Sequence, residues 1–278
     1  MLRTFRRFFP SASRMTFNTP AKLLLDAADL PARLFYPEFR RLPPNHMRVR
    51  VGTGGRYLAN QVFHLQEPRN FWLFAFSRGL VRLDHTILDI GVGCGRFAAH
   101  IRDYVQGPSR FTGSYIGVDI DAEMLAWCRQ AFPPDHFRFH LSTDASASYN
   151  RTAQAPGPYR VPEPDGSVDF VMATSLFTHL LEAELDNYLR EAARLLRPGG
   201  HLAAQFFCLD HPPPTYGGRH TFSHRVGNAH VESLAQPEAA VAYREAFLFE
   251  RVRAAGLADP ELMTGGGGWQ PLLLCRKP

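Results

Sequence analysis

Three glycines at alternate positions, directly after an apolar run, constrain this chain more than any other feature. Residues 87–90 (ILDI) predict a buried strand, and Gly91, Gly93 and Gly95 follow it before a helix-compatible stretch. Glycines there let the backbone turn sharply and let a ligand lie against bare backbone at the carboxyl end of a strand. A dinucleotide fingerprint would need its third glycine at position 96, which is Arg96. The spacing therefore favours a nucleoside-containing cofactor other than NAD.

Strand-like and helix-like segments alternate along the chain from this point. The expected strands cover 87–90, 115–119, 137–141, 168–173 and 201–208, and the expected helices cover 96–105, 122–132 and 182–196. Such alternation is typical of an α/β fold, a parallel sheet with helices on both faces. A further helix is expected over 237–255. Two apolar segments, near Leu262 and at 272–275, are then expected to close the sheet as a hairpin.

Two carboxylates stand at the ends of successive expected strands. Asp119 ends the strand YIGVD, 24 positions beyond Gly95, and is suited there to accept hydrogen bonds from both ribose hydroxyls. Asp144 follows the next strand, where a short carboxylate can accept a hydrogen bond from an adenine amino group. Each position alone is weak evidence. Their order and spacing together indicate a nucleoside-binding site.

The successive motifs LDIGVGCGRFA, YIGVDID, HLSTDAS, DGSVDFVMATSLFTHL and LLRPGG resemble those of class I S-adenosylmethionine-dependent methyltransferases. The resemblance covers roughly residues 84–208. It implies a Rossmann-like, mostly parallel sheet of seven strands whose last strand is antiparallel. It also implies S-adenosylmethionine as the cofactor.

The resemblance assigns roles around that cofactor. Asp89 and the three glycines would surround its amino acid part and ribose, Asp119 would bind the ribose hydroxyls, and Asp144 the adenine. Ile120 would flank the adenine ring. With the two residues expected near the methionine end, the implied set is Asp89, Gly91, Gly93, Gly95, Asp119, Ile120, Asp144, Thr174 and Ser175.

Three residues are candidates for the reacting end. His179 follows the strand 168–173 in the string FTHL, and imidazole is a natural base for an attacking hydroxyl near neutral pH. A structural role for His179, capping the following helix, stays open. Asp210 and His211, after the strand 201–208, form the alternative base or orienting pair.

The acceptor is expected to be a hydroxyl group of a small molecule. Methyltransferases that modify amino nitrogens of nucleobases or glutamine typically carry Asn or Asp, Pro-Pro and an aromatic residue where this chain has SLFTHL. FTHL, Tyr149-Asn150 and residues 237–243 resemble enzymes of carbohydrate and secondary-metabolite pathways, which favours a sugar or a glycosylated natural product. Two alternatives stay open: a regulatory protein that binds S-adenosylmethionine without turnover, and an N- or nucleic-acid methyltransferase.

The positive charge of the chain is concentrated in its first third. Residues 1–82 carry 14 Lys or Arg and 4 Asp or Glu, a net +10 against +5 for the whole chain. We expect a basic arm and helical cap or lid in 1–82 and the cofactor domain in 83–278, with irregular substrate loops at 142–166 and 211–236. The arm is a candidate for contact with a membrane surface. Nucleic acid is disfavoured, because a basic patch alone says only that anions are attracted.

Composition indicates a cytoplasmic protein without a bound metal. There is no run of about 18 apolar residues that would indicate a membrane span. Cysteines without any C-x-x-C pair are expected as reduced core thiols, and they are Cys94, Cys128, Cys208 and Cys275. The histidines that invite a metal interpretation match no familiar ligand spacing, and they are His211, His220, His224 and His230.

Overall fold

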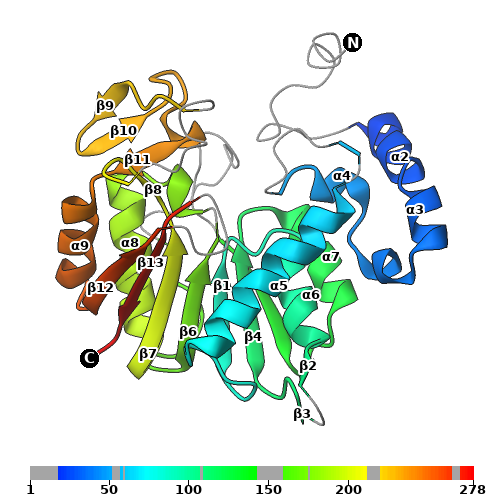
Figure 1. Cartoon of the computed structure of the whole chain (residues 1–278), viewed down its shortest axis with the longest axis horizontal. Coiled ribbons are helices and arrows are strands. Elements are labelled where there is room, and N and C mark those ends of the chain that lie inside the picture. Colours follow the sequence, from blue (N-terminus) through cyan, green and yellow to red (C-terminus); the bar gives the residue numbers. More distant parts are fainter. Residues whose placement is uncertain are drawn as a thin grey trace.

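The computed structural model describes residues 18–51, 57–58, 60–106, 109–142, 159–174, 176–211, 220–264 and 270–278. Its central element is a seven-stranded sheet with the order β12-β13-β7-β6-β1-β4-β5 (Figure 1). These strands are β1 (Thr86–Ile90), β4 (Ser114–Asp119), β5 (Phe137–Leu141), β6 (Val168–Ala173), β7 (Leu196–Gln205), β12 (Ala258–Met263) and β13 (Leu272–Arg276).

The direction of the strands matches the expected Rossmann-like arrangement. The five strands from β7 to β5 are parallel, whereas β13 is antiparallel to both of its neighbours, β7 and β12. The mostly parallel sheet with its last strand antiparallel is therefore confirmed. In such a sheet the carboxyl ends of β1, β4 and β6 meet at one edge, and this edge carries the glycine turn.

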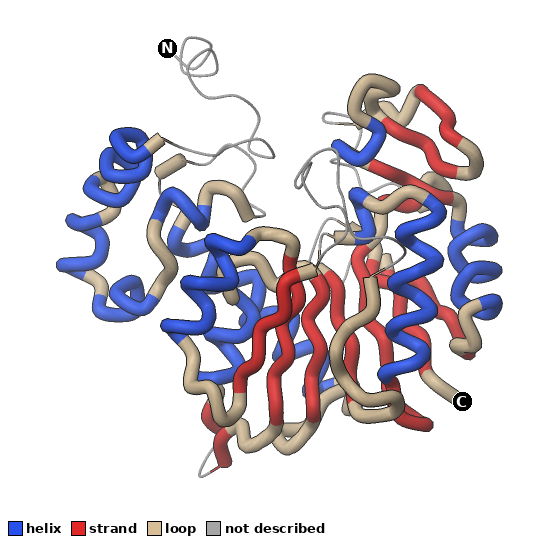
Figure 2. Tube along the Cα trace, turned by 180° about the vertical axis from the view of Figure 1, so that it is seen from behind, coloured by secondary structure: helices blue, strands red, loops and turns tan. Residues whose placement is uncertain are grey.

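Helices cover both faces of the sheet (Figures 1 and 2). Side chains alternate between the faces along each strand, so Ile87 and Tyr115 belong to one core, and Leu88 and Ile116 to the other. The first core is closed by α5 (Gln61–Ser77), α6 (Arg96–Arg102) and α7 (Ala122–Ala131), and the second by α8 (Glu182–Leu195) and α9 (Glu245–Ala254).

The helix α8 shows why these segments fold as they do. Its buried residues Leu185, Tyr188, Leu189, Ala192 and Leu195 recur at intervals of three and four and therefore form one apolar stripe against the sheet. Of the charged residues between them, Arg190 is exposed, whereas Glu191 is buried and pairs with Arg194. The expected helix at 96–105 is shorter than predicted, because α6 ends at Arg102 and the chain then forms a small pair of strands, β2 (Val105–Gln106) and β3 (Ser109–Arg110).

The N-terminal helical cap consists of α2 (Thr19–Ala27), α3 (Leu30–Phe35), the 3-10 helix η2 (Pro37–Arg41) and α4 (Asn45–Arg48). Arg48 holds it together from inside: its guanidinium is fully buried and donates to both carboxylate oxygens of Asp29, at 2.6 and 3.0 Å, and to Asn60 Oδ1 at 2.7 Å. A buried ion pair requires such added hydrogen bonds to offset the loss of hydration. Although it belongs to the basic first third of the chain, Arg48 therefore does not lie on a solvated surface.

A second, four-stranded sheet was not expected. Its order is β8-β11-β10-β9, with β8 (Phe207–Cys208), β9 (His224–Val226), β10 (Ala229–Val231) and β11 (Val241–Tyr243). The strand expected over 201–208 is thus divided between two sheets. The expected irregular stretch 211–236 contains the β9–β10 hairpin, whose two-residue turn Gly227-Asn228 is a sequence signal for a hairpin.

The helix predicted over 237–255 is wrong in its first half. Residues Pro237–Ala239 form the 3-10 helix η5, Val241–Tyr243 pair with both β8 and β10, and α9 begins only at Glu245. All three residues of β11 are buried. A short apolar run that is buried on every side has the same hydropathy pattern in a strand and in a helix, so periodicity could not separate the two. Within the described residues, no helix is both long and apolar enough to cross a bilayer.

Candidate functional site

The turn between β1 and α6 requires its glycines. Gly91, Gly93 and Gly95 have φ values of 83°, 54° and 78°, a region that favours glycine. Neighbouring side chains also press against this turn: a Cβ atom on Gly95 would lie 2.8 Å from a ring carbon of Phe132, and one on Gly91 would lie 3.2 Å from Leu176 Cβ. Both conditions exclude larger residues, so the turn exposes bare backbone at the carboxyl edge of the sheet.

Asp119, the last residue of β4, is fastened to this turn. Its Oδ2 accepts a hydrogen bond from the backbone N–H of Gly93 at 2.7 Å, and its Oδ1 accepts one from the backbone N–H of Asp121 at 2.9 Å. Burial raises the pKa of Asp119 to about 6, although the backbone N–H groups of Gly93 and Ile120 and the charge of Arg50 oppose this shift. The side chain still reaches solvent in part. Near neutral pH it therefore presents a negative charge suited to hydroxyl donors.

Asp89, in the middle of the ILDI strand, is a buried carboxylate that is only half satisfied. Tyr115 donates its hydroxyl to Asp89 Oδ2 at 2.6 Å, while Oδ1 has no hydrogen-bond partner among the described residues. Burial raises the pKa of Asp89 to about 7. A buried acceptor without a donor is costly, so a ligand that brings a cationic donor to this atom would fit the site.

The segment after β6 returns to the glycine turn. Thr174 is buried directly beyond the strand, and the side chain of Leu176 lies against Gly91. Ile120 is half-buried next to Asp119. The structure thus brings the described cofactor candidates together at one edge of the sheet. Asp144 and Ser175 lie outside the described residues.

His179 ends a 3-10 helix, η3 (Phe177–His179), three residues beyond Leu176. Its Nδ1–H donates to the backbone carbonyl of Glu238 at 2.9 Å, which ties η3 to η5. Burial lowers the pKa of His179, so the imidazole is neutral near pH 7. The N-cap residue of α8 is Leu181, whose side chain makes no capping hydrogen bond. The capping role considered for His179 stays a prediction. A neutral imidazole can accept a proton near pH 7.

Asp210 and His211 lie at the start of α9 instead. Asp210 accepts hydrogen bonds from the guanidinium of Arg244 at 2.7 Å and from the backbone N–H of Glu245 at 2.8 Å. His211 Nε2 lies 2.5 Å from Glu245 Oε2. These contacts give the pair a structural role in capping α9, and among the described residues none joins the pair to His179 or to the glycine turn. Their catalytic role stays a prediction.

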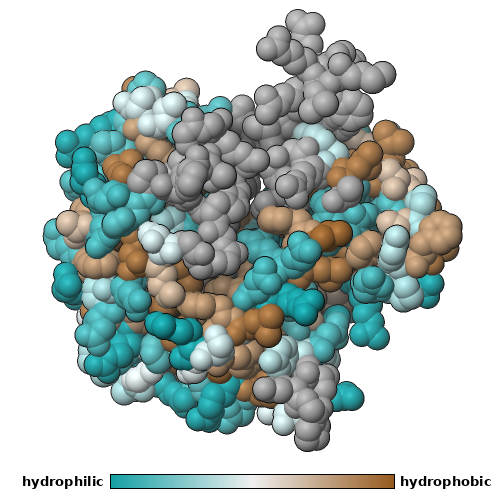
Figure 3. Space-filling view, viewed as in Figure 1, coloured by the Kyte–Doolittle hydropathy of each residue, from teal (hydrophilic) through white to brown (hydrophobic). Residues whose placement is uncertain are grey.

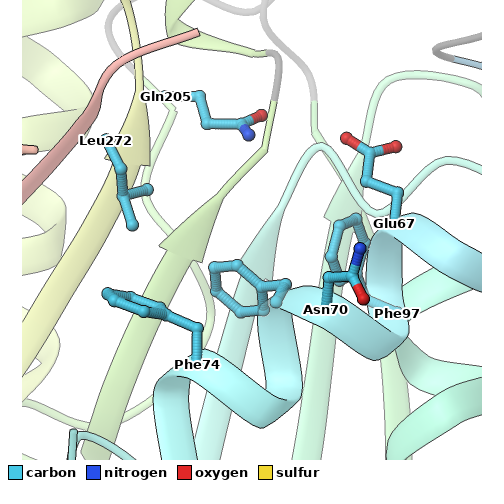
Figure 4. A pocket seen from close by; sticks show the side chains of 7 residues that line it. Glu67, Asn70, Phe74, Phe97, Gln205 and Leu272 are labelled. Carbon is cyan, nitrogen blue, oxygen red and sulfur yellow. The ribbon is translucent and has the colours of Figure 1, made fainter. Parts of the chain in front are cut away.

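A cavity of about 200 Å³ lies beside the glycine turn, between α5 and the carboxyl end of β7 (Figure 4). Its aromatic lining comes from two elements: Phe71 and Phe74 belong to α5, and Phe97 follows the glycine turn in α6. The amides of Asn70 and Gln205, with Glu67 and Leu272, complete the wall. The aromatic residues of α5 pack against the sheet, and Phe71 and Phe74 also line this cavity. Asn70 and Gln205 carried no sequence signal.

The N-terminal cap reaches the cofactor edge through Arg50 and Val51. Arg50 forms ion pairs with Asp121 and Glu123, the two acids that follow Asp119. Val51 lies over the glycine turn, where a Cβ atom on Gly93 would come within 3.1 Å of its Cγ2. The cap therefore covers part of the cofactor edge.

The histidines near the second sheet do not assemble a metal site in the described part of the chain. His220 packs against the rings of Phe207 and Phe222, with ring centroids 5.0 and 5.4 Å apart. Among the residues that the structure describes, no group of three or more His, Cys, Asp or Glu could hold a metal ion.

Comparisons with known proteins agree with this geometry. Residues 88–204 match the family described as "Methyltransferase domain". The arsenite methyltransferase of Aquipseudomonas alcaligenes is 32% identical over 117 residues, and the methyltransferase GfsG of Streptomyces halstedii is 28% identical over 129 residues. These segments are 42% and 46% of this chain, and the chain spans only 31% and 40% of the two relatives.

Solved structures show the same fold at low sequence identity. A protein of Nostoc punctiforme designated an O-methyltransferase has a TM-score of 0.54 and 16% identity, covering 80% of this chain and 59% of that one. A chain from the Haloferax volcanii complex of the Trm112 methyltransferase activator with a methyltransferase has a TM-score of 0.53 and 18% identity, covering 81% and 94%. Residues 88–204 therefore match a methyltransferase domain, and the sheet around them has the fold of the solved methyltransferase structures. S-adenosylmethionine is the cofactor of this domain.

Proposed function

We propose that this chain is an S-adenosylmethionine-dependent methyltransferase that methylates a hydroxyl group of a small molecule. The observation that carries the proposal is the state of His179: a neutral imidazole, fixed by its Nδ1–H bond to Glu238, directly after the segment that lies on the glycine turn. A hydroxyl needs a base when it attacks, whereas an unprotonated amine does not. A neutral imidazole at this place supports a hydroxyl acceptor.

Each of these groups has a separate role in the proposed methyl transfer. S-adenosylmethionine supplies an electrophilic methyl group on a sulfonium, which is already a good leaving group. The glycine turn and Asp119 hold the nucleoside part, and Asp89 offers an acceptor to the ammonium. His179 Nε2 takes the hydroxyl proton, and the resulting imidazolium keeps its Nδ1–H bond to the Glu238 carbonyl. Alignment of the reactants supplies most of the acceleration, and the base adds about 10² to 10⁴-fold.

The cavity beside the glycine turn is the proposed acceptor site. Its walls combine aromatic rings, among them Phe71 and Phe74, with the amides of Asn70 and Gln205. Pockets of this kind bind an apolar ring face and orient it through a few polar groups. A ring that bears several hydroxyls, such as a sugar or a glycosylated natural product, is the class that we propose.

A thiol-seeking acceptor such as arsenite, named for one relative, is not favoured here. Binding of such a soft ion depends on thiolates. All four cysteines of the chain are buried. Burial raises the pKa of the Cys94 thiol to about 11 and that of Cys275 to about 12, which keeps both thiols protonated.

The proposal is tested with the full chain, labelled S-adenosylmethionine and a panel of glycosides, phenols, amines and nucleic acids. We expect label in a hydroxylated small molecule. Transfer confined to amines or nucleic acids would overturn the hydroxyl assignment. Binding of the cofactor without transfer to any acceptor would favour the regulatory protein instead.

A further inference from the structure

The N-terminal cap carries an exposed apolar surface that the methyl-transfer site does not use. Among the described residues, eleven large hydrophobic side chains are exposed, and six of them fall within fourteen positions. We call these six the cap patch, and they are Leu23, Leu24, Leu30, Leu34, Phe35 and Tyr36. Figure 3 shows the brown side chains that gather over α2 and α3 at the right-hand edge of the molecule. Exposed hydrophobic side chains concentrated in this way mark an interaction site.

The exposure is a property of the fold rather than of loose packing. In α2, Leu25 is buried against the cap while Leu23 and Leu24 face outward. In α3, Leu30 and Leu34 are four residues apart and therefore share one face of the helix. Phe35 is the most exposed of the six, with 80% of its surface accessible. The cap is meanwhile held from inside by the buried Arg48–Asp29 pair.

Positive charge accompanies the patch. Arg40 donates to the backbone carbonyls of Arg33 and Leu34, at 3.1 and 3.3 Å, which places its guanidinium beside the end of α3. It has no carboxylate partner among the described residues. By sequence, residues 1–41 carry eight Lys or Arg against three Asp or Glu, and residues 1–25 contain no acid.

We propose that the cap patch docks this protein on an anionic lipid surface. Exposed leucine and phenylalanine side chains enter the boundary between headgroups and acyl chains, while neighbouring arginines are attracted to anionic headgroups. Aliphatic side chains dominate the patch, and they neither stack on nucleobases nor bind phosphates, so nucleic acid fits it less well. This inference is independent of the acceptor assigned above.

Cosedimentation of the full chain with two kinds of vesicle tests the proposal. One kind is pure phosphatidylcholine, and the other contains about a third phosphatidylserine. We expect at least about tenfold stronger binding to the anionic vesicles, weakened by salt because the headgroup attraction is screened. Equal binding to both vesicles, or binding to neither, would overturn it.

Variants test whether vesicle binding depends on the cap patch or is nonspecific hydrophobic adsorption. The double variant Leu34→Ser, Phe35→Ser removes two exposed side chains and leaves the buried core untouched. Leu141→Ser with Leu234→Ser is the control, because it also replaces two exposed large hydrophobic side chains by serine, at positions outside the cap patch. We expect the first pair to lose vesicle binding at least about tenfold and the second to keep it. If the first pair instead abolished self-association in analytical ultracentrifugation while vesicle binding stayed unchanged, the patch would be an interface between copies, and the lipid proposal would be wrong.

Discussion

The carboxylate of Asp119 accepts a hydrogen bond from the backbone N–H of Gly93, 2.7 Å away, although 26 positions separate the two residues. This contact links the end of β4 to the turn after β1. It orients one carboxylate oxygen by the turn itself and the other by the backbone of Asp121. The carboxylate that we propose to bind the ribose and the bare backbone of the glycine turn are therefore positioned by each other.

Replacement of Asp119 tests this arrangement. Asp119→Ala removes both the charge and the acceptor, and we expect the affinity for S-adenosylmethionine to fall by about 10 to 150-fold, equivalent to about 1.5 to 3 kcal/mol for a hydrogen bond to a charged group. Asp119→Asn keeps an acceptor for the Gly93 N–H and should lose less. Calorimetric titration measures both. The control is Asp165→Asn, an exposed carboxylate that should leave the affinity unchanged.

Asp89 predicts a pH dependence of cofactor binding. The cationic amino group of the ligand favours the ionised carboxylate, so below the pKa of about 7 binding must displace a proton. We expect the affinity to fall about tenfold per pH unit below that pKa, with proton release seen in buffers of different ionisation enthalpy. Asp89→Asn should bind more weakly and lose this dependence. A wild-type affinity that is constant from pH 6 to pH 8 would contradict the role given to Asp89.

The same carboxylate affects stability in the opposite direction. Because the folded-state pKa of Asp89 is raised from 3.8 to about 7, the folded protein holds a proton there that the unfolded chain releases. Stability therefore falls as pH rises through this window. Without cofactor, Asp89→Asn should be more stable than the wild type at pH 8, by up to a few kcal/mol, and by clearly less at pH 5, because the loss begins at the unfolded pKa of 3.8 and is complete only above about 7. Thermal unfolding at the two pH values measures the difference in stability. If Asp89→Asn were less stable than the wild type at pH 8, the ionised Asp89 would not destabilise the folded protein.

The sheet and the glycine turn at its edge could be predicted because both depend on short-range sequence features. Glycines with positive φ, carboxylates at strand ends and alternating apolar runs follow from backbone geometry, and Gly91, Gly95 and Asp119 lie where they were expected. The acceptor side left no such marks. Asn70 and Gln205 line one cavity only because tertiary packing brings their elements together. The strand Val241–Tyr243 is a short buried apolar run, and such a run has the same hydropathy in a strand and in a helix. Arg48 shows the same limit, because its charge indicated exposure while Asp29, nineteen residues earlier, draws it into the interior.

The glycine turn can be tested against a matched glycine elsewhere. Gly79 and Gly95 have φ values of 69° and 78°, but a Cβ atom on Gly79 would meet nothing within 4 Å, whereas one on Gly95 would lie 2.8 Å from Phe132. Gly79→Ala should cost about 1 to 2 kcal/mol from backbone strain alone. Gly95→Ala adds about 1 to 3 kcal/mol of overpacking. Urea unfolding measures the loss of stability in each variant. Equal losses would mean that the Phe132 ring moves aside at no energetic cost.

His179 predicts the pH profile of methyl transfer. Burial lowers the pKa of His179 below the ordinary 6.5, so the deprotonated base predominates at pH 7 and the rate falls in more acidic solution. At saturating cofactor, His179→Gln should lower kcat by about 10² to 10⁴-fold, remove this acidic limb and leave the affinity for S-adenosylmethionine within about twofold. Asp210→Asn is the informative comparison, because Asp210 is the rival candidate and is bound to Arg244. If Asp210→Asn removes the acidic limb while His179→Gln keeps it, the proton is taken at the start of α9 and not at η3.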